Sequence, residues 1–275
     1  MYKGDGLMGI YVSTNLFRPQ DLQGIFKLLD KVNSYIGNDE KVGIELFPEW
    51  QSEVFEKFLK ENIDKFKNYK ISLHGPYYNT EHSAEKNSEV YNRSKDYFIK
   101  TLKLSKELNS CYIVYHHNNC KFVDSDKDKI ISTSSENLLE LNKLANEYSA
   151  NIVVENAGVM FNGNMLFNEE EFIKMAKSID NSILIDIGHA FANKWNLENV
   201  ICELKYKIIS YHLHNNNGVN DNHNSIMNGK LDIKDFINLY KKYTPNADLV
   251  IEYGTHCNRD INGIVNDINW IRENL

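Results

Sequence analysis

The chain has 275 residues, of which 42% are hydrophobic and 25% charged, a composition typical of a globular protein with a sizeable core. Its net charge of −7 gives no general attraction for nucleic acid or anionic lipid, which disfavours both as partners. No apolar stretch approaches the roughly 20 residues needed to span a bilayer, and the first residues lack the apolar region of a secretory signal. We therefore expect a cytoplasmic protein.

Eight apolar segments of strand length recur along the chain and are rich in β-branched and aromatic residues. They lie at residues 9–14, 41–47, 70–74, 111–116, 151–155, 182–187, 208–213 and 248–253. These segments are apolar throughout rather than alternating with polar residues. That pattern is expected for parallel strands that are buried on both faces.

Amphipathic helical patterns separate these segments. Residues 51–67 and 133–147 carry apolar side chains at i, i+3 and i+4 spacing with charged residues opposite them. Asn168, followed three residues later by Glu171, resembles a capping box, and Asp232 precedes a further helical pattern. Helices therefore connect the predicted strands.

Strand and helix alternating eight times is the pattern of a (β/α)8 barrel. A doubly wound open sheet is the structural alternative, but it normally has a glycine-rich phosphate loop after its first strand. Here residues 9–15 run directly into Leu16-Phe17-Arg18 without such a loop. We predict an α/β fold over residues 1–275, a single TIM barrel domain with its active site at the C-terminal rim of the strands.

Six of the predicted strands end in a residue type that binds metals. These residues are His74, His116, Glu155, Asp186, His212 and Glu252. Three more candidates, His189, Asp221 and His223, lie in the segments that follow two of these strand ends. A barrel brings all nine to one rim, where carboxylates without cations would repel each other and raise one another's pKa values. The sequence therefore predicts a divalent metal centre with nitrogen and oxygen ligands.

The remaining candidates concern the surroundings of this rim. His116 and His117 are adjacent, so one of them points inward from the strand, and we favour His116. The candidate substrate-binding residues are Tyr77, Asn156, Trp195 and His214. By default, His82, His117, His214 and His256 are assigned to loops, to the surface or to the surroundings of the ligands.

Seven motifs occur in order at barrel spacing. They are Ser72-Leu73-His74-Gly75-Pro76-Tyr77, Val114-Tyr115-His116, Val154-Glu155-Asn156, Asp186-Ile187-Gly188-His189-Ala190-Phe191, His212-Leu213-His214-Asn215, Asp221-Asn222-His223 and Ile251-Glu252. Together they resemble the xylose isomerase-like barrel superfamily, which contains sugar isomerases and epimerases as well as endonuclease IV-type apurinic-site nucleases. The resemblance covers most of the chain, from Gly43-Ile44-Glu45-Leu46-Phe47 onward.

This resemblance implies two possible ligand sets. In the isomerase and epimerase branch, one divalent ion, zinc or manganese, is held at positions that match Glu155, Asp186, His212 and Glu252. The two glutamates there also exchange protons with the sugar carbon. In the nuclease branch, three zinc ions are held at those four positions together with positions that match His74, His116, His189, Asp221 and His223.

Several motifs depart from the nuclease pattern. It has His-Pro-Gly where this chain has residues 116–118, and Asp-Thr-Cys-His where this chain has residues 186–189. It has His-x-Asn-Asp where this chain has residues 212–215. The run at 212–218 looks more like the uncharacterised isomerase/epimerase-like branch, although it lacks the arginine that ketose 3-epimerases place a few residues after the histidine.

We therefore favour a metal-dependent isomerase or epimerase of a small sugar or sugar phosphate, with one to three zinc or manganese ions per chain. Glu155 and Glu252 are the expected acid/base groups, and His189 is expected to orient a substrate hydroxyl. An endonuclease IV-like hydrolase acting on abasic DNA remains the alternative. A catalytically silent binding barrel is the third hypothesis.

Overall fold

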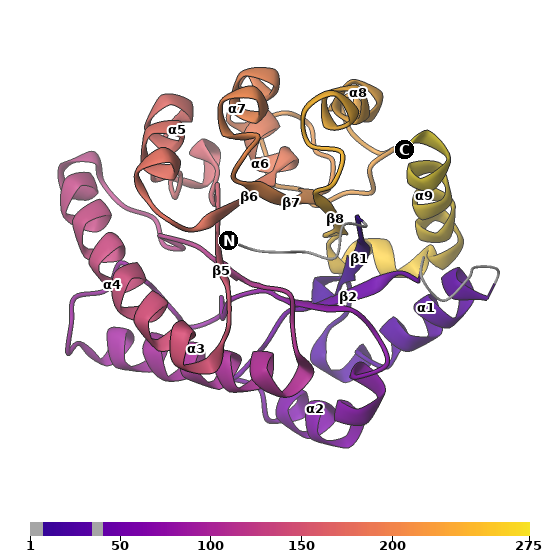
Figure 1. Cartoon of the computed structure of the whole chain (residues 1–275), viewed down its shortest axis with the longest axis horizontal. Coiled ribbons are helices and arrows are strands. Elements are labelled where there is room, and N and C mark those ends of the chain that lie inside the picture. Colours follow the sequence, from indigo (N-terminus) through magenta and orange to yellow (C-terminus); the bar gives the residue numbers. More distant parts are fainter. Residues whose placement is uncertain (1–7, 35–40) are drawn as a thin grey trace.

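The computed structural model describes residues 8–34 and 41–275 and contains a closed barrel of eight parallel strands that pair in chain order. The strands are β1 (Ile10–Ser13), β2 (Gly43–Leu46), β3 (Ile71–Leu73), β4 (Ile113–Tyr115), β5 (Ile152–Glu155), β6 (Ser182–Asp186), β7 (Ile208–Leu213) and β8 (Asp248–Ile251). Figure 1 shows the helices arranged around these strands. The predicted (β/α)8 barrel is confirmed.

Each predicted strand segment contains one observed strand. Most segments are slightly longer than the strand itself, because ladder hydrogen bonds end where the chain turns into a loop. The prediction for β7 coincides with the observed Ile208–Leu213. Five of the six strand-end candidates therefore stand at the last strand position or directly after it, and His212 is the penultimate residue of β7.

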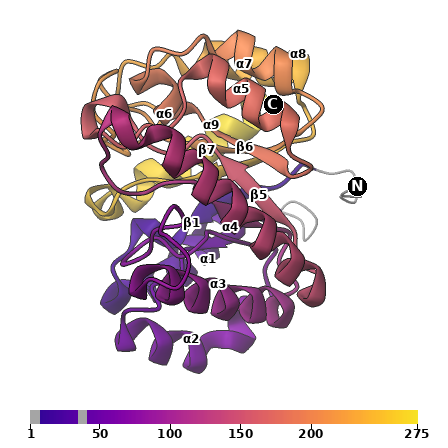
Figure 2. The same cartoon turned by 90° about the vertical axis from the view of Figure 1, so that its left-hand side faces the viewer.

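Helices connect successive strands and pack around the barrel. They are α1 (Gly24–Asn33), α2 (Glu53–Phe66), α3 (Glu89–Leu108), α4 (Lys127–Tyr148), α5 (Glu169–Ser178), α6 (Ile187–Ala192), α7 (Leu197–Leu204), α8 (Ile233–Tyr243) and α9 (Ile261–Asn274). Two helices, α6 and α7, follow β6, which departs from strict alternation. Figures 1 and 2 place α2 and α3 on one side of the strands and α7 and α8 on the opposite side.

Local capping signals act as predicted. Asn168 and Glu171 form a capping box at the start of α5, and Asp232 caps α8 by accepting from the N–H groups of Lys234 and Asp235. Capping satisfies backbone donors that have no partner within the helix. In contrast, α4 begins at Lys127, well before the predicted 133–147 segment.

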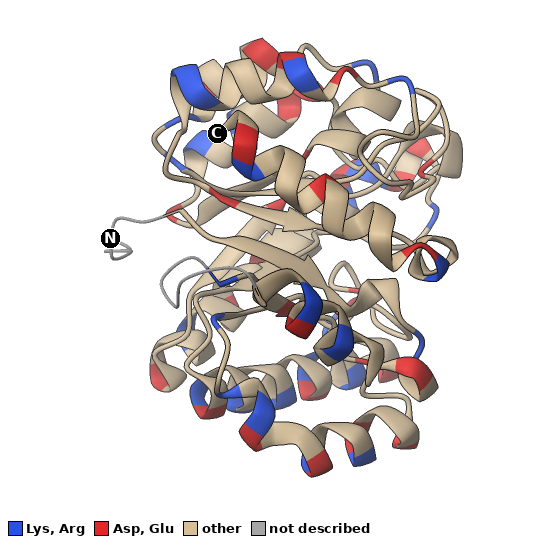
Figure 3. Cartoon of the chain, turned by 90° about the vertical axis from the view of Figure 1, so that its right-hand side faces the viewer, with Lys and Arg blue, Asp and Glu red and all other residues tan. Residues whose placement is uncertain are grey.

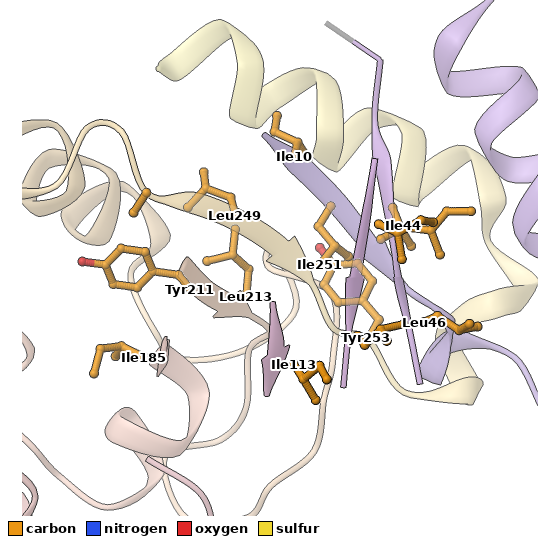
Figure 4. Close-up of a cluster of buried hydrophobic side chains, with 14 of the residues drawn as sticks. Ile10, Ile44, Leu46, Ile113, Ile185, Tyr211, Leu213, Leu249, Ile251 and Tyr253 are labelled. Carbon is orange, nitrogen blue, oxygen red and sulfur yellow. The ribbon is translucent and has the colours of Figure 1, made fainter. Parts of the chain in front are cut away.

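Strand side chains point alternately outward and inward, which gives the barrel two apolar layers. The outward layer packs under the helices and includes Ile44, Leu213 and Ile251 (Figure 4). A separate inner cluster consists of Tyr112, Val114, Val153 and Leu184. Polar side chains also occupy fully buried strand positions, namely Ser13, Glu45, Ser72 and Ser210.

Charged residues are confined mostly to the outer helices. Lys and Arg residues are interspersed there with Asp and Glu residues (Figure 3). None of the helices in the described part of the chain is long and apolar enough to cross a membrane.

Candidate metal centre

The structure brings all nine predicted ligands to the C-terminal rim of the barrel. Candidate donor atoms fall into overlapping groups, and within each group they lie within 4.8 Å of one another. Three of these groups are Glu155–Asp186–His212, His74–His116–Glu155 and His189–His214–Asp221–His223. All of their members are predicted metal ligands except His214. Glu155 belongs to two of the groups, so the clusters are contiguous.

His212, on β7, lies at the centre of the first group. Its Nδ1 atom lies 3.2 Å from Oε2 of Glu252, 3.4 Å from Oε2 of Glu155 and 3.9 Å from Oδ2 of Asp186. These carboxylates come from β8, β5 and β6. Four strand ends therefore direct one nitrogen and three carboxylates toward a common point.

A second group lies between β3, β4 and β5. Nε2 of His116 is 2.9 Å from Oε2 of Glu155, and Nε2 of His74 is 4.0 Å from the same oxygen. The structure places His116 beside Glu155, as we predicted, whereas Nδ1 of the adjacent His117 lies 3.1 Å from the Ser134 hydroxyl. Glu155 is thus shared between this group and the His212 group.

The third group involves the loop after β7. Asp221 lies 3.2 Å from Nε2 of His189 and, through its other oxygen, 3.2 Å from Nε2 of His223. Nδ1 of His189 lies 3.3 Å from Oε1 of Glu155. The His189 ring therefore contacts carboxylates of two groups.

Neighbouring groups hold the histidine rings in defined orientations. Nδ1 of His74 contacts the Gly75 carbonyl at 2.7 Å, and Nδ1 of His223 contacts the Glu252 carbonyl at 2.8 Å. Nδ1 of His116 lies 3.0 Å from the Asn119 amide oxygen. Because a carbonyl oxygen accepts, Nδ1 carries a proton in these three rings, and Nε2, which faces the carboxylates, is the nitrogen that can bind an ion when the ring is neutral.

Burial and neighbouring charges set the protonation of the cluster. Burial, assisted by His116, lowers the pKa of His74 to about 4, so this ring is neutral at pH 7. Burial acts in the same direction on His212, but the surrounding carboxylates raise its pKa well above the usual value. Burial raises the pKa of Glu252, yet His212 and His223 bring it down to about 2. Cationic imidazoles therefore balance the buried carboxylates.

The donor set fits a divalent ion. Nδ1 of His212, Nδ1 of His189 and Oδ1 of Asp221 are buried without a hydrogen-bond partner, although carboxylate or imidazole groups lie close to them. Ligand atoms on a tetrahedral ion with bonds of about 2.1 Å lie roughly 3.4 Å apart, similar to the spacing found around His212. A bound cation would satisfy these atoms and neutralise the carboxylates.

A pocket of about 210 Å³ opens above the clusters. It is lined by Asn15, Phe47, His74, Tyr77, Tyr78, His116, Asn118, Asn119, Glu155, Ala157, Gly158, Asn162, Asn164, His189, Asp221, His223 and Glu252. The predicted substrate-binding residue Tyr77 belongs to this lining. Phe47 stacks on His74 with the ring centroids 4.3 Å apart, which supports one wall of the pocket.

The structure places three other predicted substrate-binding residues outside this lining. Asn156 hydrogen-bonds the backbone N–H and carbonyl of Asp186, and Nε2 of His214 lies 3.0 Å from the carboxylate of Asp186. Trp195 packs against Phe172 with the ring centroids 5.5 Å apart. In this geometry Asn156 and His214 position Asp186, one of the predicted metal ligands. Trp195 contributes to the packing.

Sequence reasoning missed Glu45, which lies on β2 and is completely buried. Its Oε1 atom lies 3.1 Å from Nε2 of His212. The signal was present, because Glu45 is one acidic residue within the otherwise apolar run at residues 42–47. It was overlooked because Leu46 and Phe47 follow it within the predicted segment, whereas most of the other candidates close their apolar runs.

Comparison with known proteins places this fold and site in a family. A model of the xylose isomerase-like TIM barrel family matches residues 39–274. The chain belongs to this family. The resemblance inferred from the seven motifs is thereby confirmed.

Individual proteins align along nearly the whole chain. The uncharacterized protein MJ1614 of Methanocaldococcus jannaschii is 28% identical over 252 residues, covering 89% of this chain and 92% of that protein. The crystal structure of a D-tagatose 3-epimerase-like protein superposes with a TM-score of 0.74 at 21% identity, covering 97% of this chain and 99% of that one. An IolI protein with a bound zinc atom superposes with a TM-score of 0.75 at 15% identity, covering 96% and 98%. At these identities the solved structures show the shared fold.

Proposed function

We propose that the chain is a metal-dependent isomerase or epimerase that acts on a small, uncharged sugar. The observation that carries the proposal is the pair of glutamates at the ends of β5 and β8. Glu155 and Glu252 both line the pocket, and both place a carboxylate oxygen within 3.4 Å of Nδ1 of His212. Two carboxylates that share one site can remove a proton from a carbon beside a carbonyl and return one.

Glu155, Asp186, His212 and Glu252 are the residues that would hold the ion. Their mixture of one imidazole and three carboxylates suits zinc or manganese. A divalent ion bound there would polarise the oxygens of the sugar and make the neighbouring C–H bond more acidic. The zinc atom in the IolI structure supports this choice of cofactor.

Both glutamates are in the ionised form that can accept a proton. Burial raises the pKa of Glu155, but the charges of His116 and His212 hold it well below its usual range, and Glu252 behaves in the same way. Both are therefore ionised at neutral pH. His189 lines the pocket beside Glu155, where its ring can orient a substrate hydroxyl.

The pocket lining supports an uncharged substrate rather than a sugar phosphate. Five asparagines contribute to it: Asn15, Asn118, Asn119, Asn162 and Asn164. Among the described residues, the lining contains neither Lys nor Arg. A phosphate group is normally bound by such cations, whereas amide groups match the hydroxyls of a neutral sugar. Phe47, Tyr77 and Tyr78 supply apolar faces for the sugar ring.

The proposal is tested with a panel of free ketoses and aldoses and the matching sugar phosphates. The protein is loaded with Zn²⁺ or Mn²⁺ and incubated in D2O, and the products are followed by NMR. We expect interconversion of at least one free sugar, with deuterium incorporated at the reacting carbon, and at least a 100-fold loss in Glu252→Gln, in line with typical acid/base contributions. A Glu252→Gln variant with full turnover would rule out the proposed role.

The second candidate function is metal-dependent hydrolysis of a phosphodiester, as in the apurinic-site nucleases. The observation that favours it is the pair of additional clusters, His74–His116–Glu155 and His189–Asp221–His223, which a one-metal isomerase does not require. Several ions side by side could activate water and stabilise a leaving oxygen. The absence of Lys and Arg from the described lining of the pocket argues for sugar chemistry instead.

Metal content and a nicking assay separate the two functions. One tightly bound ion per chain favours the isomerase, and two or three zinc ions favour the hydrolase. Cleavage of duplex DNA that contains an abasic site is measured at full metal loading. Nicking at that site, together with inactivity on all sugars, would replace our proposal with the second one.

A further inference from the structure

We propose that Glu45 is a positioning residue that determines which nitrogen of His212 faces the metal. The inference rests on the metal centre of the proposed function. It concerns a residue of β2 that the ligand set does not contain and that does not line the pocket.

Glu45 and His212 meet across the barrel interior. Both side chains are completely buried. The two carboxylate oxygens of Glu45 lie 3.1 and 3.3 Å from Nε2 of His212, and Ser72 donates its hydroxyl to one of them at 3.4 Å. A carboxylate accepts hydrogen bonds, so this contact requires the proton of His212 on Nε2.

In the neutral ring that binds an ion, a proton held on Nε2 leaves the lone pair of His212 on Nδ1. That atom is the one that faces Glu155, Asp186 and Glu252, at 3.4, 3.9 and 3.2 Å respectively. Glu45 therefore selects the tautomer in which His212 can bind an ion together with the three carboxylates. Partners of this kind, on the far side of a ligating imidazole, orient the ring and raise its basicity.

His212 needs its own partner because its ring is reversed relative to the neighbouring histidines. His74, His116 and His223 each direct Nδ1 to a carbonyl oxygen and present Nε2 to the cluster. Loop atoms serve as those acceptors. The far side of His212 instead faces the barrel interior, where Glu45 provides the acceptor.

Glu45 could also ligate an ion directly, since it forms a possible donor group with His212 and Glu252. The distribution of donors argues against this. Nδ1 of His212 has close carboxylates from three strand ends. The close carboxylate at Nε2 of His212 is that of Glu45. A metal on the Nδ1 side gains more ligands, and Glu45 then serves as the hydrogen-bond acceptor.

Zinc titration of the full-length protein tests the inference. Wild type is compared with Glu45→Leu, Glu45→Gln and the control Ser72→Ala, which removes the other hydrogen-bond partner of Glu45. We expect Glu45→Leu to weaken zinc binding by about 10- to 100-fold, the usual effect of losing such a partner. Glu45→Gln should lose less, because its amide oxygen still accepts from Nε2–H, and Ser72→Ala should bind as wild type does.

NMR of ¹⁵N-histidine-labelled protein reads the tautomer without relying on activity. The zinc-loaded wild type should show the His212 proton on Nε2, and Glu45→Leu should lose this single state. A proton on Nδ1 in the wild type, or wild-type zinc affinity in Glu45→Leu, would overturn the inference. If Glu45→Leu does not fold, Glu45→Gln and the wild-type spectrum decide.

These readouts separate the inference from the proposed function. Protein that binds zinc with the expected tautomer but converts no sugar would support the role of Glu45 and count against the isomerase. A wild-type chain that binds no divalent ion would overturn both.

Discussion

The imidazole of His214 occupies the space that a side chain at residue 188 would need. A Cβ atom on Gly188 would lie 2.1 Å from Cε1 of His214, closer than any real contact. Nε2 of His214 in turn lies 3.0 Å from the carboxylate of Asp186. The nuclease pattern differs at both positions, with Cys and Asn. The two departures are therefore linked, because the glycine leaves room for the histidine that holds Asp186.

We predict that Gly188→Ala displaces the His214 ring and disturbs Asp186. Overpacking of this kind typically costs about 1–3 kcal/mol of stability. Urea unfolding of the metal-free protein measures this loss, and zinc titration should show weaker binding. In a His214→Ala background the same substitution should cost little, because the obstructing ring is gone. Equal losses in both backgrounds would show that the cost has another origin.

We predict that replacing a histidine of the His74–His116–Glu155 group lowers the metal content of the protein only if that group holds an ion. His116→Ala removes the nitrogen that lies 2.9 Å from Glu155. His256→Ala is the matched control, because His256 is exposed and its ring contacts Asn224. Elemental analysis should find one ion fewer in His116→Ala if two or more ions bind. If both variants bind one ion per chain, as wild type does, the metal centre consists of the group around His212 only.

We predict that a divalent ion stabilises the fold. The buried carboxylates and the unpartnered atoms of His189 and His212 gain a ligand on binding. An ion at 100 times its dissociation constant should add about 2.7 kcal/mol to the free energy of unfolding. Thermal unfolding with and without a chelator measures the shift. Identical melting temperatures for wild type in zinc and in chelator would argue against a resident metal.

We predict that Asp248 makes the metal-free protein less stable as the pH rises. Burial raises its pKa from 3.8 to about 6. The folded state thus holds the proton more tightly, and the resulting stability is present below pH 4 and lost as the pH rises through 6. Asp248→Asn keeps an acceptor for the Gly9 N–H and avoids the charge. It should be more stable than wild type at pH 8 by up to about 3 kcal/mol, with no difference at pH 4.

Urea unfolding at both pH values, with a chelator present, measures this difference. A variant that gains the same stability at pH 4 and pH 8 would show that packing, rather than charge, is responsible.

The fold and the gathering of the nine candidate ligands at one rim could be predicted because both depend on local patterns and one topological rule. Each strand is a short apolar run, and parallel strands in a barrel direct their C-terminal ends to one rim. Residues as distant as His74 and Glu252 are therefore brought together by architecture alone. No knowledge of individual contacts was needed for these nine positions.

Contacts that depend on side-chain direction could not be predicted in this way. Glu45 and His212 are 167 positions apart and meet inside the barrel, where inward and outward positions of an apolar strand look alike in sequence. Trp195 follows the His189 motif closely, but the helix α6 carries it away from the pocket, against Phe172. The asparagines of the lining stand in loops and in two short 3-10 helices, without regular periodicity.

Anomalous diffraction from crystals of the zinc-loaded protein tests the central claim most directly, because it locates each ion relative to its ligands. We predict a peak bound by Glu155, Asp186, His212 and Glu252, with Nδ1 as the ligating atom of His212. Crystals that contain zinc but show no peak among these four residues would contradict the account.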